Sequence, residues 1–135
     1  MQTHLTHLLF KVAPSNLPFY KELFAFLGWQ IWHDVPEMLG LGAENGVSVW
    51  FDANVTAGSN DYDGPGLNHF AIGTATQADV DATASYLAAH GIPALFDTPR
   101  HRPEFISAKS GYYQVMFETP DRILIEVVYN GLPTT

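Results

Sequence analysis

Three residues with metal-binding side chains interrupt runs that are otherwise apolar. His7 lies in "THLLFKV", His69 in "GLNHFAIG" and Glu126 in "ILIEVVYN". A buried imidazole must be hydrogen-bonded or bound to a ligand, and an isolated buried carboxylate is very costly. Two imidazole nitrogens and one carboxylate oxygen suit a divalent ion such as Fe, Mn, Co, Ni or Zn, and leave positions open for water or substrate. These three residues are therefore candidate metal ligands.

Each of them also has an ordinary structural explanation. A core histidine can be satisfied by hydrogen bonds alone, and Glu126 can be neutralised by a buried basic residue. Lys11 and Arg122 are the basic residues that fit by position, in a chain with only six Lys and Arg. The sequence leaves these alternatives open.

The order of predicted elements repeats in the two halves of the chain. His7 and His69 are 62 residues apart, and each lies near the start of a predicted strand. Apolar patterning and turn residues predict a strand, a helix and three strands in each half. The ranges are 7–12, 15–28, 29–35, 37–42 and 47–53 in the first half, and 67–74, 76–91, 92–98, 112–118 and 123–129 in the second. We predict an α+β fold of two βαβββ modules, about 1–58 and 65–131, joined by a linker at 59–64.

The two predicted helices have recognisable ends and apolar faces. Ser15 or Asn16 can cap the first helix and Thr76 the second, and a glycine can close each of them. The expected buried faces are Phe19, Leu23, Phe24 and Leu27 in the first helix and Val80, Ala84 and Leu87 in the second.

Composition excludes several classes of partner. The net charge of −8 makes binding to nucleic acid or to an anionic membrane surface improbable. The chain has no Cys, which excludes disulfides and thiol catalysis and fits a reducing compartment. No signal-type segment and no apolar run long enough to cross a bilayer is present, so we expect a cytoplasmic protein.

The arrangement of these motifs resembles the vicinal oxygen chelate superfamily, which includes glyoxalase I, extradiol dioxygenases, fosfomycin-resistance thiol transferases and bleomycin-resistance proteins. The resemblance rests on the strand histidines, the "FY…LG" helix, the second helix ending in "GI" and the final "PDRILIE". It covers essentially the whole chain. It implies a curved mixed sheet around a metal-site cleft, with His7, His69 and Glu126 as ligands. It leaves the metal open among Fe, Mn, Zn and Ni.

Two departures from the family pattern limit what the resemblance implies. Glyoxalase I has a fourth ligand, a glutamate, at a position that falls here on Val49, or on Trp50 if the register shifts by one. Neither side chain binds a metal, so the usual acid–base carboxylate is missing. The family turn "DPDG" is here "TPDR", at 119–122.

Other residues are expected near the site. Strand alternation places Tyr112, Gln114 and Met116 on one face, which by the resemblance faces the metal cavity. We predict Tyr112 and Gln114 as catalytic or substrate-binding residues. The segment 98–111 is long, irregular and rich in basic residues, and it is either a lid or a solvated loop.

The predicted function is that of a metal-dependent enzyme that chelates vicinal oxygens of a small organic substrate. Extradiol ring cleavage is one such reaction, although no second histidine stands at a convincing position. The alternative is a metal-free small-molecule binding protein of the bleomycin-resistance type. A fosfomycin thiol transferase would need more basic residues than the chain offers.

The first module is also expected to take part in assembly. Its large apolar side chains exceed what one helix can cover; they include Trp29, Trp32, Trp50 and Phe51. We therefore predict a symmetric homodimer. If modules are exchanged between chains, His7 would come from one chain and His69 and Glu126 from the other.

Overall fold

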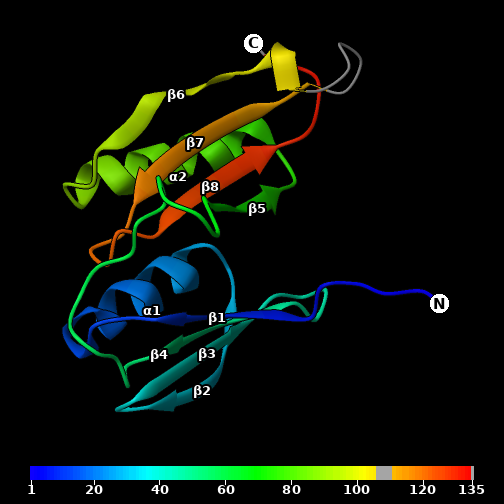
Figure 1. Cartoon of the computed structure of the whole chain (residues 1–135). Helices are drawn as coiled ribbons and strands as arrows, with labels where there is room; N and C mark the ends of the chain where they lie inside the picture. The colour runs from blue at the N-terminus through cyan, green and yellow to red at the C-terminus, as the bar shows by residue number, and fades with distance from the viewer. Residues whose placement is uncertain (106–110, 135) are drawn as a thin grey trace. The chain divides into compact units, whose positions relative to one another are not determined.

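Each half of the chain folds into a four-stranded mixed sheet with one α-helix packed against it (Figure 1). A computed structural model describes residues 1–105 and 111–134. The chain divides into two units, Met1–Gly58 and Ser59–Thr135, called here the first and second unit. The predicted α+β class and the βαβββ order of each half are confirmed.

The first unit has its strands in the order β1-β4-β3-β2. Strand β1 runs parallel to β4, and the other neighbours are antiparallel. The elements are β1 (His7–Lys11), the 3₁₀ turn η1 (Pro14–Asn16), α1 (Leu17–Phe26), β2 (Gln30–Val35), β3 (Met38–Gly42) and β4 (Ser48–Asp52).

The second unit repeats this topology, with the order β5-β8-β7-β6 and a parallel β5–β8 pair. Its elements are β5 (Phe70–Thr74), α2 (Gln77–Ala89), β6 (Ala94–His101), the 3₁₀ turn η2 (Pro103–Phe105), β7 (Tyr113–Glu118) and β8 (Leu124–Tyr129). Because the two sheets have the same order and the same parallel pair, residues of one unit have defined equivalents in the other.

The helix starts differ between the units. Thr76 caps α2 in a reciprocal capping box with Asp79, as the sequence predicts. No side chain caps α1, so the prediction of a Ser15 or Asn16 cap is wrong. The chain enters α1 through the turn η1 instead, in which the Asn16 N–H donates to the Ala13 carbonyl at 2.9 Å.

An aromatic cluster forms the core of the first unit. The Phe51 ring is fully buried and stacks on Tyr20 with a centroid distance of 4.0 Å, and Phe24 packs edge-on against it. Leu23 and Phe24 are buried as predicted, but Phe19 and Leu27 are only half-buried. Tyr20, which was not predicted on this face, takes the central place through its stacking on Phe51.

Helix α2 covers the sheet of the second unit with Val80, Thr83 and Leu87. Ala84, predicted on this face, is half-buried. Thr83 is tolerated in the core because its hydroxyl donates to the Asp79 carbonyl at 2.8 Å, which satisfies its polar group within the helix. The sheet face toward the helix is almost completely buried; it carries Val115, Phe117, Ile125 and Val127.

The predicted linker 59–64 and part of the segment 98–111 make defined contacts within the second unit. In the segment 59–64, the Tyr62 hydroxyl donates to Glu118 Oε2 at 2.6 Å and Asn60 donates to the Arg122 carbonyl at 2.9 Å. Within 98–111, residues 98–101 complete β6 and 103–105 form η2, so the description of the whole segment as irregular is wrong. Residues 106–110 lie outside the described part.

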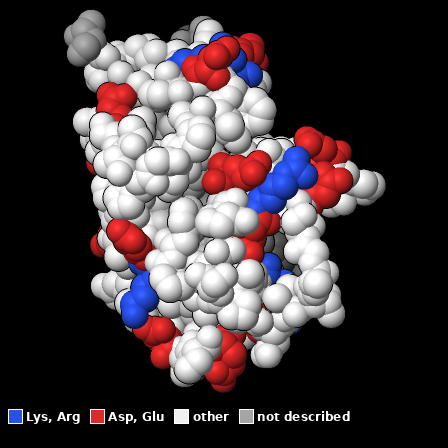
Figure 2. Space-filling model, turned by 90° about the vertical axis from the view of Figure 1, so that its left-hand side faces the viewer, with Lys and Arg blue, Asp and Glu red and all other residues white. Residues whose placement is uncertain are grey.

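Basic side chains on the face shown in Figure 2 lie beside acidic ones. The ion pairs agree with this view: Lys11 Nζ lies 2.6 Å from Asp52 Oδ2, and Lys21 Nζ lies 2.6 Å from Asp34 Oδ2. Among the helices of the described residues, none is long and apolar enough to cross a membrane.

Candidate metal site in the second unit

The parallel pairing of β5 with β8 brings His69 next to Glu126. Ala71 stands opposite Glu126 in the ladder, and His69, two residues earlier, points to the same face of the sheet. The His69 Nε2 atom lies 3.0 Å from Glu126 Oε2. The Glu126 side chain is only 2% exposed, so this carboxylate depends on its immediate partners.

The second oxygen of Glu126 is occupied by a tyrosine. Tyr112, just before β7, donates its hydroxyl to Glu126 Oε1. Burial, followed by the hydrogen bond to Glu126 and its charge, raises the pKa of Tyr112 well above the usual value. The phenol therefore stays protonated at neutral pH and remains a donor, which orients the carboxylate with Oε2 toward His69.

The basic partners considered for Glu126 are engaged elsewhere. Lys11 binds Asp52, and the Arg122 guanidinium lies within 4 Å of the carboxylates of Asp61, Asp63 and Glu118. The alternative that Lys11 or Arg122 neutralises Glu126 is therefore wrong.

Asn68 determines which nitrogen of His69 carries a proton. The Asn68 amide nitrogen donates to the Tyr62 carbonyl at 2.8 Å, which orients the amide and turns its oxygen toward His69. That oxygen, Oδ1, lies 2.7 Å from His69 Nδ1. An amide oxygen can only accept a hydrogen bond, so Nδ1 must carry the proton. In the neutral ring, Nε2 then presents its lone pair to Glu126.

This arrangement fits a divalent cation. A lone pair on Nε2 facing a carboxylate oxygen at 3.0 Å is repulsive unless a proton or a cation lies between them. Two ligand atoms that bind one ion at about 2.1 Å and at right angles to each other are about 3 Å apart. The donor types, their spacing and the partner on Nδ1 would suit a histidine and a carboxylate that share a metal ion.

We expect the metal-free protein to show His69 as the Nδ1-protonated tautomer, measured from the ring ¹⁵N shifts by NMR. Asn68→Leu removes the acceptor and should shift the tautomer population toward Nε2–H, which can then donate to Glu126. Asn68→Asp keeps an acceptor at the same place and should preserve the wild-type pattern. An unchanged tautomer in Asn68→Leu would contradict the role assigned to Asn68.

His7, the third predicted ligand, belongs to the first unit. It opens β1 and its side chain is exposed. Its Nδ1 lies 3.0 Å from the hydroxyl of Thr6, so in both units the residue just before the histidine engages Nδ1 and leaves Nε2 available. The second unit by itself brings together two of the three predicted ligands. No group of three or more His, Asp or Glu side chains that could hold a metal ion occurs within residues 1–105 and 111–134.

The register of the first sheet identifies the position equivalent to Glu126. Leu9 stands opposite Trp50 as Ala71 stands opposite Glu126, so the equivalent residue is Trp50 rather than Val49. The Trp50 indole N–H donates to the Ser48 hydroxyl at 2.9 Å. The first unit therefore has no carboxylate at the place where glyoxalase I has its additional ligand.

The candidate site opens into a cavity of about 830 Å³. Tyr112, Gln114 and Met116 all line it, which agrees with the strand alternation predicted for them. The other lining residues are Tyr62, Asp63, Asn68, His69, Phe96, Asp97, Arg100, Arg102, Phe105, Leu124 and Glu126.

Sequence reasoning missed Asn68, Arg100 and Arg102 as residues of this site. The two arginines fall in the segment whose basic clustering stood out, but nothing in the sequence placed that segment against His69. An asparagine directly before a candidate ligand histidine was the available signal for Asn68.

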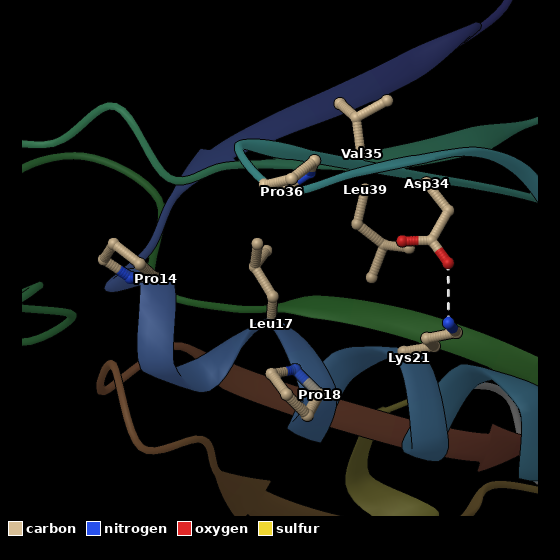
Figure 3. Close-up of a pocket in the computed structure, with 8 residues that line it drawn as sticks. All are labelled: Pro14, Leu17, Pro18, Lys21, Asp34, Val35, Pro36 and Leu39. Carbon is tan, nitrogen blue, oxygen red and sulfur yellow. Dashed lines mark hydrogen bonds and ion pairs between the residues drawn. The ribbon is translucent and has the colours of Figure 1, made fainter.

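A second cavity, of about 520 Å³, lies in the first unit (Figure 3). Leu17 of α1 and Leu39 of β3 point toward each other across it, and the Lys21–Asp34 ion pair lies at one side. Three prolines contribute to its lining: Pro14, Pro18 and Pro36. The two charged side chains that line it, Lys21 and Asp34, form an ion pair with each other. This cavity therefore has no set of reactive groups like the one at His69 and Glu126.

Comparisons with known proteins find likeness in structure. No family model matches the chain, and no curated protein sequence matches it. A protein from Bacillus halodurans with a provisional glyoxalase description superposes with a TM-score of 0.76 at 22% identity, over 95% of this chain and 96% of that one. A glyoxalase/dioxygenase from Nostoc punctiforme has a TM-score of 0.71 at 12% identity, over 96% and 92%.

The fosfomycin resistance protein FosX from Listeria monocytogenes is also similar in structure. Its complex with Mn(II) and sulfate has a TM-score of 0.68 at 17% identity, over 98% of this chain and 94% of that one. A variant of FosX was solved with Mn(II) and 1S,2S-dihydroxypropylphosphonic acid. Together these likenesses confirm the expected resemblance at the level of the fold. The chain has the fold of the vicinal oxygen chelate superfamily.

Proposed function

We propose that this protein is a metal-dependent enzyme that holds a divalent ion through His7, His69 and Glu126 and acts on a small organic substrate with two neighbouring oxygens. The apposition of His69 Nε2 and Glu126 Oε2 at 3.0 Å carries the proposal. The Nδ1 atom of His69 donates to Asn68, so Nε2 and the facing Glu126 oxygen suit a shared cation. FosX, which has the same fold, is complexed with Mn(II), and this supports a divalent metal here.

His7 is included because of the repeat and its local contacts. It occupies in the first unit the place of His69 in the second, and Thr6 engages its Nδ1 as Asn68 engages that of His69. Imidazole Nε2 is a common metal donor when Nδ1 is held by a partner outside the ligand set.

The cavity residues supply positioning around the ion. A bound divalent ion would act as a Lewis acid and stabilise negative charge on a substrate oxygen. Tyr112 holds its proton and keeps Glu126 oriented, so only Oε2 faces His69. Gln114 is 1% exposed and lies beside Tyr112 in the cavity lining, where its amide can bind a substrate oxygen. We assign Tyr112 and Gln114 to substrate binding and orientation.

The lining favours some reactions over others. His69 is the single histidine among the described residues that line the cavity, so a second histidine for extradiol ring cleavage has no candidate there. The dihydroxypropylphosphonic acid bound to FosX has adjacent hydroxyl oxygens, the kind of group that a single ion can chelate. We therefore favour polarisation of a vicinal dioxygen substrate over oxygen-dependent ring opening.

Metal binding tests the proposal directly. Purified protein titrated separately with Mn(II), Ni(II), Zn(II) and anaerobic Fe(II) in a calorimeter should bind about one ion per chain for at least one metal. His7→Ala and His69→Ala should each weaken that binding, whereas the exposed His4→Ala is the matched control and should not. Binding of less than about a tenth of an equivalent for every metal would contradict the proposal and favour the metal-free binding protein.

We also propose that the protein is a homodimer. Leu9, Ile31 and Trp32 of the first unit are each about half exposed, which leaves apolar surface for a second copy. Light scattering across a dilution series at low micromolar concentration should give close to twice the chain mass of 14.9 kDa. A mass equal to that of one chain at every concentration would contradict the dimer. Metal binding that persists in the monomer would contradict an exchange of His7 between chains.

A further inference from the structure

Two of the three arginines of this acidic protein line the cavity that contains His69 and Glu126. The chain has six Lys and Arg in total and a net charge of −8. Arg100 and Arg102 both belong to the cavity lining, whereas Arg122 does not. Such a concentration of scarce guanidinium groups at one cavity points to a ligand that carries negative charge.

Arg102 is held in place rather than extended into solvent. Its side chain is 17% exposed, and its guanidinium carbon lies 4.1 Å from the centre of the Phe105 ring. Its Nε lies 2.5 Å from Glu104 Oε1, and its Nη1 donates to Gln114 Oε1 at 3.3 Å. These contacts use two of the five N–H groups of a guanidinium. The remaining donors, in a fixed planar group, suit the oxygens of a carboxylate or phosphonate.

A distortion of β6 places Arg100 in the same lining. Leu95 pairs with Met116 and Arg100 with Gln114, so five steps along β6 correspond to two along β7. Within this bulge Phe96 and Asp97 have φ values of 58° and 56°, a left-handed conformation that bulky side chains seldom adopt. Bulges next to binding sites turn side chains toward the ligand, and here Phe96, Asp97 and Arg100 all line the cavity.

A chain of polar contacts links Arg102 to the candidate metal carboxylate. Arg102 donates to Gln114, Gln114 lies beside Tyr112 in the cavity lining, and Tyr112 donates to Glu126. Gln114 and Glu126 are both almost completely buried. The guanidinium and the Glu126 carboxylate therefore have fixed positions within one network, as two-point recognition of a small molecule requires.

The remaining carboxylates of the lining leave the two arginines available. Asp63 lies 3.2 Å from the guanidinium of Arg122. Asp97 lies in the bulge with an exposed side chain, where solvent screens its charge.

We propose that Arg100 and Arg102 form a subsite for the anionic oxygen group of the substrate, a carboxylate or a phosphonate. The subsite stands on the arginines alone. A further part of the proposal is that the same molecule also reaches His69 and Glu126, and this part rests on the proposed metal-dependent function.

Inorganic phosphate and acetate are the probes for the metal-free protein, followed through the arginine Nε–H signals by NMR at constant ionic strength. We expect the Arg102 signal to shift saturably. Arg102→Gln and Arg100→Gln should each weaken binding about tenfold or more, since each removes charge-assisted hydrogen bonds. Arg102→Lys should recover part of the loss, and Arg122→Gln is the control that should bind normally. Stronger binding of phosphate than of acetate would indicate a phosphonate group, and the reverse a carboxylate.

A shift that does not saturate, or equal binding by wild type and the double Gln variant, would overturn the subsite. Calorimetric titration of the same variants with Mn(II) separates this outcome from failure of the metal site. Loss of phosphate binding with unchanged Mn(II) affinity is the result expected for a subsite that is separate from the ligands. Loss of both phosphate binding and Mn(II) binding, in a variant with a wild-type circular dichroism spectrum, would show that the arginine subsite is not separate from the metal ligands.

Discussion

Replacing Glu126 by glutamine should weaken the binding of a divalent ion by more than about a hundredfold, because even partners outside the ligand set contribute 10- to 100-fold to metal affinity. The amide has no charge and its nitrogen cannot bind the ion. It does suit the metal-free site, since its oxygen can accept from Tyr112 and its nitrogen can donate to the lone pair of His69 Nε2.

The fold of the Glu126→Gln variant should therefore be retained. We expect Tm to change by no more than about 4 °C, the shift that roughly 1 kcal/mol produces in a chain of this size. Glu118→Gln is the matched control, because Glu118 lies on β7 beside β8, accepts from Tyr62 and does not line the cavity. Metal affinity within about threefold of wild type in Glu126→Gln would show that this carboxylate is not a ligand.

The second large effect is expected in the core of the first unit. Phe51→Ala should lower the free energy of unfolding by about 3–5 kcal/mol, the range for removing a large buried side chain. Phe51 is fully buried between Tyr20, Phe24 and Phe10, with ring centroids at 4.0, 5.7 and 5.8 Å. Its loss opens a cavity that α1 and the sheet can fill only by moving toward each other.

Fluorescence makes this experiment specific to one unit. All three tryptophans, Trp29, Trp32 and Trp50, belong to the first unit, so their emission during urea unfolding follows that unit alone. Phe26→Ala is the control, since Phe26 is 41% exposed and its loss should cost less than about 1 kcal/mol. If Phe51→Ala and Phe26→Ala unfold at the same urea concentration, the central place of Phe51 in the core is contradicted. Circular dichroism, which reports both units, then shows whether the second unit unfolds in the same transition.

Local patterns were sufficient to predict the elements and their order. Helix α2 follows from its capping residue and its apolar spacing, and β8 follows from an apolar run that only Glu126 interrupts. These signals depend on neighbours a few residues apart, which is the distance over which propensity and periodicity act. Prediction failed at Asn16, where two local structures can begin a helix: a 3₁₀ turn forms there instead of the expected side-chain cap.

The sequence by itself determined that His7 and His69 are equivalent and that Glu126 needs a polar partner, because the repeat and the apolar context are properties of the chain order. Only the tertiary structure decided which partner Glu126 has. His69 reaches it through the register of β5 on β8, and Tyr112 reaches it from just before the adjacent strand β7. Register is set by contacts between residues more than fifty positions apart, such as Ala71 and Glu126, and a shift by one would turn each side chain to the other face. For the same reason Trp50 rather than Val49 was identified as the counterpart of Glu126, and Arg100 was located at the cavity only through the bulge in β6.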